Sequence, residues 1–235
     1  MHVVKQVLSG LTLALAGALP AAAQTFAPPR SCALDLTAQL RQCHVVNIYR
    51  CAGDAPGDRW LSFADGAGIY FSSRIDSETR WVESINHDTG AVDRLLPKAK
   101  DHASFSTLLE TGYDDYDFMT ESSDGTVEQF VGYDRLTGES VQIDGIALQR
   151  SEFDLSSYDA AGSFLTRRVG TQFISPELRL FFGDVEVFEN AEGERVESMQ
   201  PPVTFALPGE EGFGAVKPVF DCNAVLTGEL PGGGA

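Results

Sequence analysis

The sequence predicts an all-β domain, mainly an antiparallel meander that curves into a half-barrel or barrel-like sheet, with one short helix and stabilising disulfide bonds. Segments of alternating polar and apolar residues recur along the chain, and turn sequences such as Ser-Asp-Gly at 123–125 separate them. In residues 151–158, Phe153 and Leu155 fall on one face of an extended strand, and polar side chains fall on the other. One face of the sheet is therefore expected to be core and the other solvated.

Before the helix, turn sequences rich in Gly, Asp, Asn and Pro separate the expected strands. These strands are expected at residues 44–50, 59–64, 68–74, 79–85 and 91–96. Residues 33–42 fit neither the helical nor the strand period. We therefore expect a short helix or an irregular segment there.

The helix is expected over residues 101–109. Asp101 is a candidate N-cap, and Gly112 lies just beyond the expected end. Phe105, Leu108 and Leu109 would form its apolar stripe. This helix is expected to cover an open end or an edge of the sheet.

A second set of strands is expected after the helix, with a turn at 136–138. These strands are expected at residues 116–122, 126–134, 140–147, 152–158, 163–173, 178–188 and, as an edge strand, 203–207. The two meanders together give a dozen or fewer antiparallel strands. A sheet of this size normally curls into a barrel or half-barrel, or splits into a sandwich.

The first 23 residues have the features of a secretory signal peptide. A single basic residue, Lys5, precedes an apolar run from residue 7 to residue 19, and small residues at 21–23 suggest cleavage after Ala23. We expect an exported protein, periplasmic in the first place and extracellular as the alternative. Nothing after the signal is apolar for long enough to predict a transmembrane segment.

The remaining chain fits one domain. We expect a flexible lead-in at 24–31, a single β-rich domain at 32–226 and a loose tail at 227–235. Removing Lys5 with the signal leaves 16 basic against 34 acidic side chains, a net charge of −18. This charge disfavours nucleic acid as a partner.

Four cysteines, Cys32, Cys43, Cys51 and Cys222, predict two disulfides in an exported protein. If residues 44–50 form one extended strand, the α-carbons of Cys43 and Cys51 lie about 26 Å apart, too far for a disulfide. Geometry thus disfavours that pair. Both remaining pairings connect Cys222 to the N-terminal region.

No catalytic, metal or cofactor motif is present in the sequence. The histidines His44, His87 and His102 lack metal-ligand spacing. No nucleophile elbow, phosphate-binding loop or dinucleotide fingerprint occurs. We therefore expect no cofactor, no metal site and no catalytic residue, although an acidic cluster at 113–117 leaves calcium binding open.

Aromatic residues are numerous, and a curved sheet with surplus aromatic surface can enclose an apolar ligand. The two arginines among the candidates would meet an acidic head group at the mouth. The candidate ligand-binding residues are Trp60, Phe63, Tyr70, Phe71, Trp81, Phe181, Phe182, Arg167 and Arg168.

Three classes of function remain open. The sequence favours a binding protein of the cell envelope, a carrier or sensor of an apolar or amphiphilic ligand. The alternative is an adaptor or inhibitor that binds another exported protein. An enzyme ranks last, because the chain shows no catalytic constellation. A carrier predicts an aromatic-lined cavity of about a few hundred Å³, an adaptor predicts a filled interior with a surface apolar patch, and an enzyme predicts converging polar groups with shifted ionisation.

Overall fold

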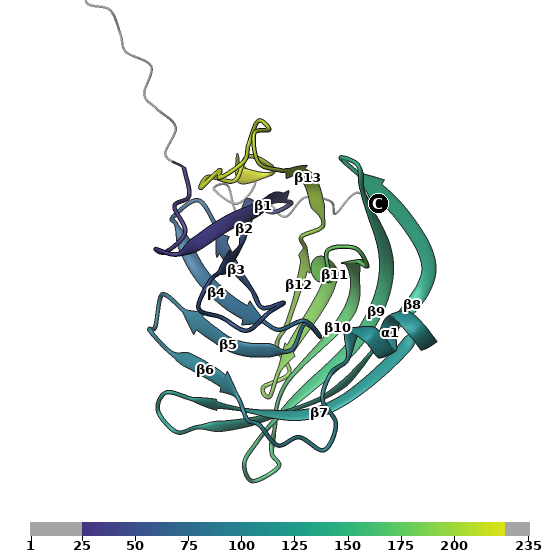
Figure 1. The fold of residues 1–235 in the computed structure, drawn as a ribbon. Coiled ribbons are helices and arrows are strands. Elements are labelled where there is room, and N and C mark those ends of the chain that lie inside the picture. The colour runs from purple at the N-terminus through teal and green to yellow at the C-terminus, as the bar shows by residue number, and fades with distance from the viewer. Residues whose placement is uncertain (1–24, 224–235) are drawn as a thin grey trace, which may run out of the picture.

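In the computed structural model, which describes residues 25–223, thirteen strands form a single curved antiparallel sheet that does not close (Figure 1). The predicted fold class is confirmed, with one strand more than expected, one helix and two disulfides. The expected signal peptide at 1–23 and the expected tail at 227–235 lie outside the described residues.

Six strands precede the helix, and five of them begin and end within two residues of the predicted positions. They are β1 (Cys32–Leu40), β2 (His44–Cys51), β3 (Arg59–Ala64), β4 (Ile69–Ile75), β5 (Trp81–Asn86) and β6 (Val92–Leu95). The expectation of a helix or irregular segment at 33–42 was wrong, because this stretch contains β1. The last five residues of β1 are all buried, so the strand shows no alternation.

The outer face of β1 is buried by the C-terminal segment. The Oγ1 of Thr37 accepts a hydrogen bond from the backbone N–H of Gly214 at 2.8 Å. The Oε1 of Gln39 accepts one from Val219 at 3.0 Å. Polar side chains on a buried face are thereby satisfied, and this explains why an apolar periodicity is missing from the sequence.

The helix α1 (Phe105–Thr111) lies four residues further along the chain than its predicted start. Ser104, rather than Asp101, is the N-cap, and its Oγ accepts from the backbone N–H of Thr107 at 3.2 Å. The helix ends at Gly112 in the left-handed conformation, as expected. Phe105 and Leu108 are buried against Ile174 of the sheet.

Seven strands follow the helix. They are β7 (Tyr113–Ser122), β8 (Val127–Ile143), β9 (Ile146–Asp159), β10 (Phe164–Ser175), β11 (Leu180–Asn190), β12 (Arg195–Met199) and β13 (Pro202–Ala206). The expected turn at 136–138 is instead a bulge inside β8, where the register with β9 shifts between Leu136 and Ser140. β12 was not predicted, because its mostly exposed residues lack an apolar period.

The sheet follows the chain order from β12 back to β1, and β13 then pairs with the outer side of β1. β12 and β13 are therefore the two edge strands, although they follow one another in sequence (Figure 1). The backbone N–H of Gln200 bonds to the carbonyl of Asp184 at 2.8 Å, and that of Arg41 bonds to the carbonyl of Pro201 at 3.1 Å. Residues 200–201 thus carry the chain from one edge of the curved sheet to the other.

Two glycines permit close packing between the long strands. A Cβ at Gly132 would lie 2.3 Å from the carbonyl oxygen of Asp154, and a Cβ at Gly170 would lie 1.9 Å from that of Val185. Both distances are far below van der Waals contact, so any side chain there would force the backbones apart. Gly132 is opposite Leu155, and Gly170 is opposite Phe153, so both glycines share the face of the two predicted inward residues.

Two disulfides fix the N-terminal hairpin and the C-terminal segment. Cys32 and Cys51 are directly opposite each other on β1 and β2. Cys43, in the β1–β2 turn, is bonded to Cys222. Cys43 and Cys51 are not paired, and Cys222 is tied to the N-terminal region, as the strand geometry predicted.

Candidate functional site

Two adjoining cavities lie within the curve of the sheet. The small chamber, of about 180 Å³, is lined by residues from β5 to β11 and from the segment before α1, including Trp81, Tyr116 and Asp134. The large chamber, of about 490 Å³, reaches from Phe63 on β3 to Phe188 on β11. Strands far apart in the sheet order line the same space, so the chambers occupy the concave side.

The two chambers share part of their walls. Both are lined by Thr79, Trp81, Leu155, Arg168 and Phe181. The shared residues lie on four different strands and on the β4–β5 turn. The chambers therefore form one continuous site with two compartments.

An aromatic cluster dominates one wall of this site. The ring of Trp81 stands edge-on to Phe118, with centroids 5.8 Å apart, and to Phe130, with centroids 5.6 Å apart. Phe118 and Phe130 stack at 5.3 Å. Trp81 remains 41% exposed despite these contacts. Such an exposed indole is available to a ligand.

Polar groups converge in the small chamber. The Nη1 of Arg168 lies 3.3 Å from the Oε1 of Glu186 and forms an ion pair with it. The Oδ1 of Asp134 accepts a hydrogen bond from the Nε2 of Gln172. A largely apolar cavity with a few convergent polar groups is the general form of a small-molecule site.

Asp134 and Asp114 form a buried acidic pair. They are directly opposite each other on β8 and β7, and they are 9% and 7% exposed. Burial, with a smaller contribution from the charge of Asp114, raises the pKa of Asp134 to about 7 despite the hydrogen bond from Gln172. Burial also raises the pKa of Asp114 to about 6, although the backbone N–H of Ser104 donates to its Oδ2 at 2.8 Å. Only Asp134 of this pair lines the chamber.

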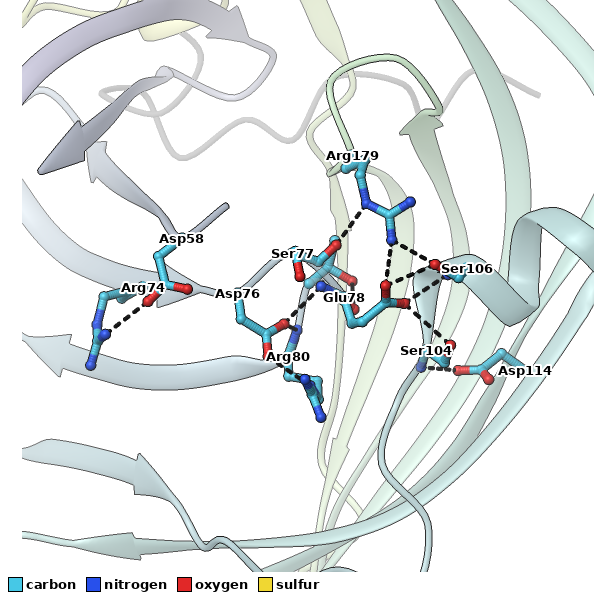
Figure 2. A network of polar contacts seen from close by, with 11 residues as sticks. Asp58, Arg74, Asp76, Ser77, Glu78, Arg80, Ser104, Ser106, Asp114 and Arg179 are labelled. Atoms are coloured by element: carbon cyan, nitrogen blue, oxygen red, sulfur yellow. Dashed lines mark hydrogen bonds and ion pairs between the residues drawn. The ribbon is translucent and has the colours of Figure 1, made fainter. Parts of the chain in front are cut away.

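A polar network borders the small chamber, and Figure 2 shows Glu78 at its centre. The Nη2 of Arg179 donates to Glu78 at 2.8 Å, and the Nε of Arg179 donates to the carbonyl of Ser77 at 2.6 Å. The backbone N–H and the Oγ of Ser106 donate to Glu78 at 2.9 and 2.8 Å. The network joins the β4–β5 turn, the start of α1 and the β10–β11 turn.

The ionised form of Glu78 is favoured in this network. Burial raises the pKa of Glu78, but hydrogen bonds from Ser106 and the charge of Arg179 outweigh it and hold the pKa below its usual value. The guanidinium of Arg179 also lies 4.9 Å from the ring centroid of Phe105. Glu78 and Arg179, which pair with each other, thus connect the β4–β5 turn, the start of α1 and the β10–β11 turn beside the cavity.

The structure brings together five of the nine predicted ligand-binding residues: Phe63, Phe71, Trp81, Phe181 and Arg168 line the chambers. The other four side chains lie elsewhere. Trp60 stacks on Tyr49, Tyr70 packs against His44, Phe182 packs against Phe205 in the main core, and Arg167 pairs with Asp154.

Several lining residues were missed by the sequence reasoning. Asp134, Gln172 and Glu186 line the small chamber, but none of them is among the predicted ligand-binding residues. A signal existed for Asp134, because Phe130, Gly132, Asp134 and Leu136 alternate onto one face of β8. A carboxylate on an otherwise apolar face is a recognisable exception to the strand pattern.

The acidic cluster at 113–117 does not converge on one point. Asp114 is buried, Asp115 is exposed, and Asp117 pairs with Lys100 at 3.0 Å. Within residues 25–223, no group of three His, Cys, Asp or Glu side chains is arranged to hold a metal ion. In the same part of the chain, no helix is long and apolar enough to cross a membrane.

Comparison of the chain with protein-family models, curated proteins and solved structures yields no match.

Proposed function

We propose that this protein is an exported binding protein that carries or senses an apolar or amphiphilic small molecule in the cell envelope. The observation that carries the proposal is the aromatic-lined cavity, with chambers of about 180 and 490 Å³. This size is in the range of small-molecule sites. The two disulfides and the predicted signal peptide support export, with the periplasm as the first expectation.

The adaptor alternative has less support. It expects a filled interior, whereas Trp81, Phe130 and Phe188 border open space. An adaptor also expects a contiguous apolar patch on the outside. The cavity therefore favours a small molecule over a protein partner.

An enzyme has one supporting observation, the raised pKa values of Asp114 and Asp134. Acid–base catalysis by two carboxylates needs both of them to reach the substrate. Asp134 lines the small chamber, but Asp114 does not. The Oδ2 of Asp114 instead accepts a hydrogen bond from the backbone N–H of Ser104. Binding therefore remains the better supported function.

Native mass spectrometry of the mature chain, purified with its disulfides intact, tests the proposal. We expect a bound molecule of discrete mass that organic extraction removes, and uptake of the apolar fluorophore N-phenyl-1-naphthylamine by the extracted protein. Ser84→Trp should block that uptake, because Ser84 lines the large chamber.

The control is Val131→Trp, at an exposed position of β8. It should leave uptake of the fluorophore unchanged. Absence of any bound mass together with absence of fluorophore uptake would refute the carrier function.

A further inference from the structure

Among the charged side chains that line the chambers, both arginines form an ion pair, and carboxylates are more numerous than arginines. Arg80 has its own partner in Asp76 at 2.7 Å, and Arg168 has Glu186 at 3.3 Å. Three further carboxylates, Asp134, Asp93 and Glu128, line the chambers. Acidic side chains therefore outnumber basic ones in the lining, and both arginines already have a carboxylate partner.

Asp134 is the most deeply placed of these carboxylates. It is 9% exposed, and its hydrogen-bond partner within the described chain is the neutral amide of Gln172. Within residues 25–223, none of the ion pairs includes Asp134 or its neighbour Asp114. Two buried carboxylates that face each other without a cation are destabilising when ionised, and a positive charge placed beside them would offset that cost.

Aromatic rings surround the same place. Tyr116, Phe118 and Phe153 line the small chamber together with Asp134, and Trp81 borders it on the side of the large chamber. Phe153 is directly opposite Asp134 on the neighbouring strand. The faces of such rings attract ammonium groups, most strongly where water is excluded.

We propose that the ligand of this cavity carries an ammonium-type cationic head group, which binds to Asp134 among the rings of the small chamber, with its apolar part in the large chamber. This inference rests on the binding function proposed above. The chamber volumes fit this division, with the smaller one at the carboxylate and the larger one lined by Phe63, Phe71 and Phe188. Trp81, Leu155 and Phe181 line both chambers, so the head and the tail occupy continuous space.

An acidic head group, which the sequence suggested through Arg167 and Arg168, fits this geometry less well. Arg167 pairs with Asp154 away from the chambers, and Arg168 is engaged by Glu186. An anion in the small chamber would also face the carboxylates of Asp134 and Glu186. Electrostatic repulsion from these two groups disfavours it.

The test compares three probes that share one decyl chain: decyltrimethylammonium, decyl maltoside and decanoate. Calorimetric titration below the micellar concentration, at a mildly alkaline pH, measures the affinity of the intact mature chain for each. We expect decyltrimethylammonium to bind at least about tenfold more tightly than the other two.

Asp134→Asn should remove this preference, because the amide keeps the shape of the side chain and loses its charge. Asp115→Asn is the matched control, since it removes the same charge from an exposed position on β7 and leaves the cavity intact. It should change each affinity by less than about twofold. The preference of the unmodified protein among the probes is a second readout that does not depend on the folding of a variant.

Two results would overturn the inference. Decyl maltoside or decanoate binding as tightly as the ammonium probe, or Asp134→Asn keeping the preference, would refute the cationic head group and leave the binding function in place. Failure of all three probes to bind would refute both.

Discussion

Replacement of Asp134 by Asn is expected to stabilise the free protein, and increasingly so as the pH rises. Burial raises the pKa of Asp134 to about 7 from the ordinary aspartate value of 3.8. The folded state therefore binds more protons than the unfolded state between these two values, so ionisation of Asp134 lowers the stability as the pH rises through this window. An increase in pKa of about three corresponds to about 4 kcal/mol.

The size of the effect follows from the same values. Near pH 4, the buried carboxyl is protonated and contributes a penalty of less than about 1 kcal/mol, whereas above about pH 8 the penalty approaches about 4 kcal/mol. The advantage of Asp134→Asn over the unmodified chain should thus grow by about 3 kcal/mol across this range. Any contribution of the amide that does not depend on pH cancels in the comparison between pH values.

Urea unfolding followed by circular dichroism, with the disulfides intact, measures this difference at both ends of the range. Asp115→Asn serves as the control, because that side chain is exposed. A stability difference between Asp134→Asn and the unmodified chain that stays constant with pH to within about 0.5 kcal/mol would refute the reasoning, since it would mean that Asp134 ionises normally in the folded state.

Three further predictions concern the frame that holds the cavity. Gly170→Ala should cost at least about 3 kcal/mol of unfolding free energy, because the new Cβ meets the carbonyl oxygen of Val185 at 1.9 Å. The control Gly183→Ala, whose Cβ has its closest neighbour at 3.5 Å, should cost under about 1 kcal/mol. Equal losses of the two variants in urea unfolding would contradict this prediction. Opening the Cys43–Cys222 disulfide by paired Ser substitutions should cost about 2 kcal/mol more than opening Cys32–Cys51, since the sequence separations are 179 and 19; an equal or reversed order in thermal unfolding would argue against the loop-entropy explanation. Arg179→Met should lower stability by about 1 to 3 kcal/mol, because Glu78 loses its cation while it stays partly buried. The fold lowers the pKa of Glu78, so the stability lost in Arg179→Met should shrink as the pH falls from the unfolded pKa of Glu78 through its folded pKa. A loss of stability that persists undiminished in acid would show that Glu78 is not the group involved.

Local patterns were sufficient for most of the fold. Alternation and turn residues located β2 to β6 within two residues, because each of these strands has a recognisable boundary. The sequence did not predict β1, and the reason is physical. The C-terminal segment, held by Cys222, covers the outer face of β1 with hydrogen bonds to Thr37 and Gln39. That cover lies about 180 residues away in sequence, and no local window contains it.

The candidate site was only partly predictable. Tyr70 and Phe71 are adjacent on β4, so they point to opposite faces, and Phe71 lines the large chamber while Tyr70 packs against His44. The alternation rule alone separates this pair. The pairing of Asp134 with Asp114 is different, because it depends on the register of β7 against β8, which the sequence does not specify.

Asp134 connects stability to function in this protein. A buried carboxylate that has no cation beside it lowers stability when it ionises, so the fold alone gives no reason for an acid at this position. A bound cation would replace the proton and remove that cost, so the binding of a cationic ligand should stabilise the chain most where Asp134 is ionised. Asp134→Asn is then expected to strengthen the free fold and to weaken ligand binding. Opposite effects of one substitution on stability and on binding are what a residue placed for function produces.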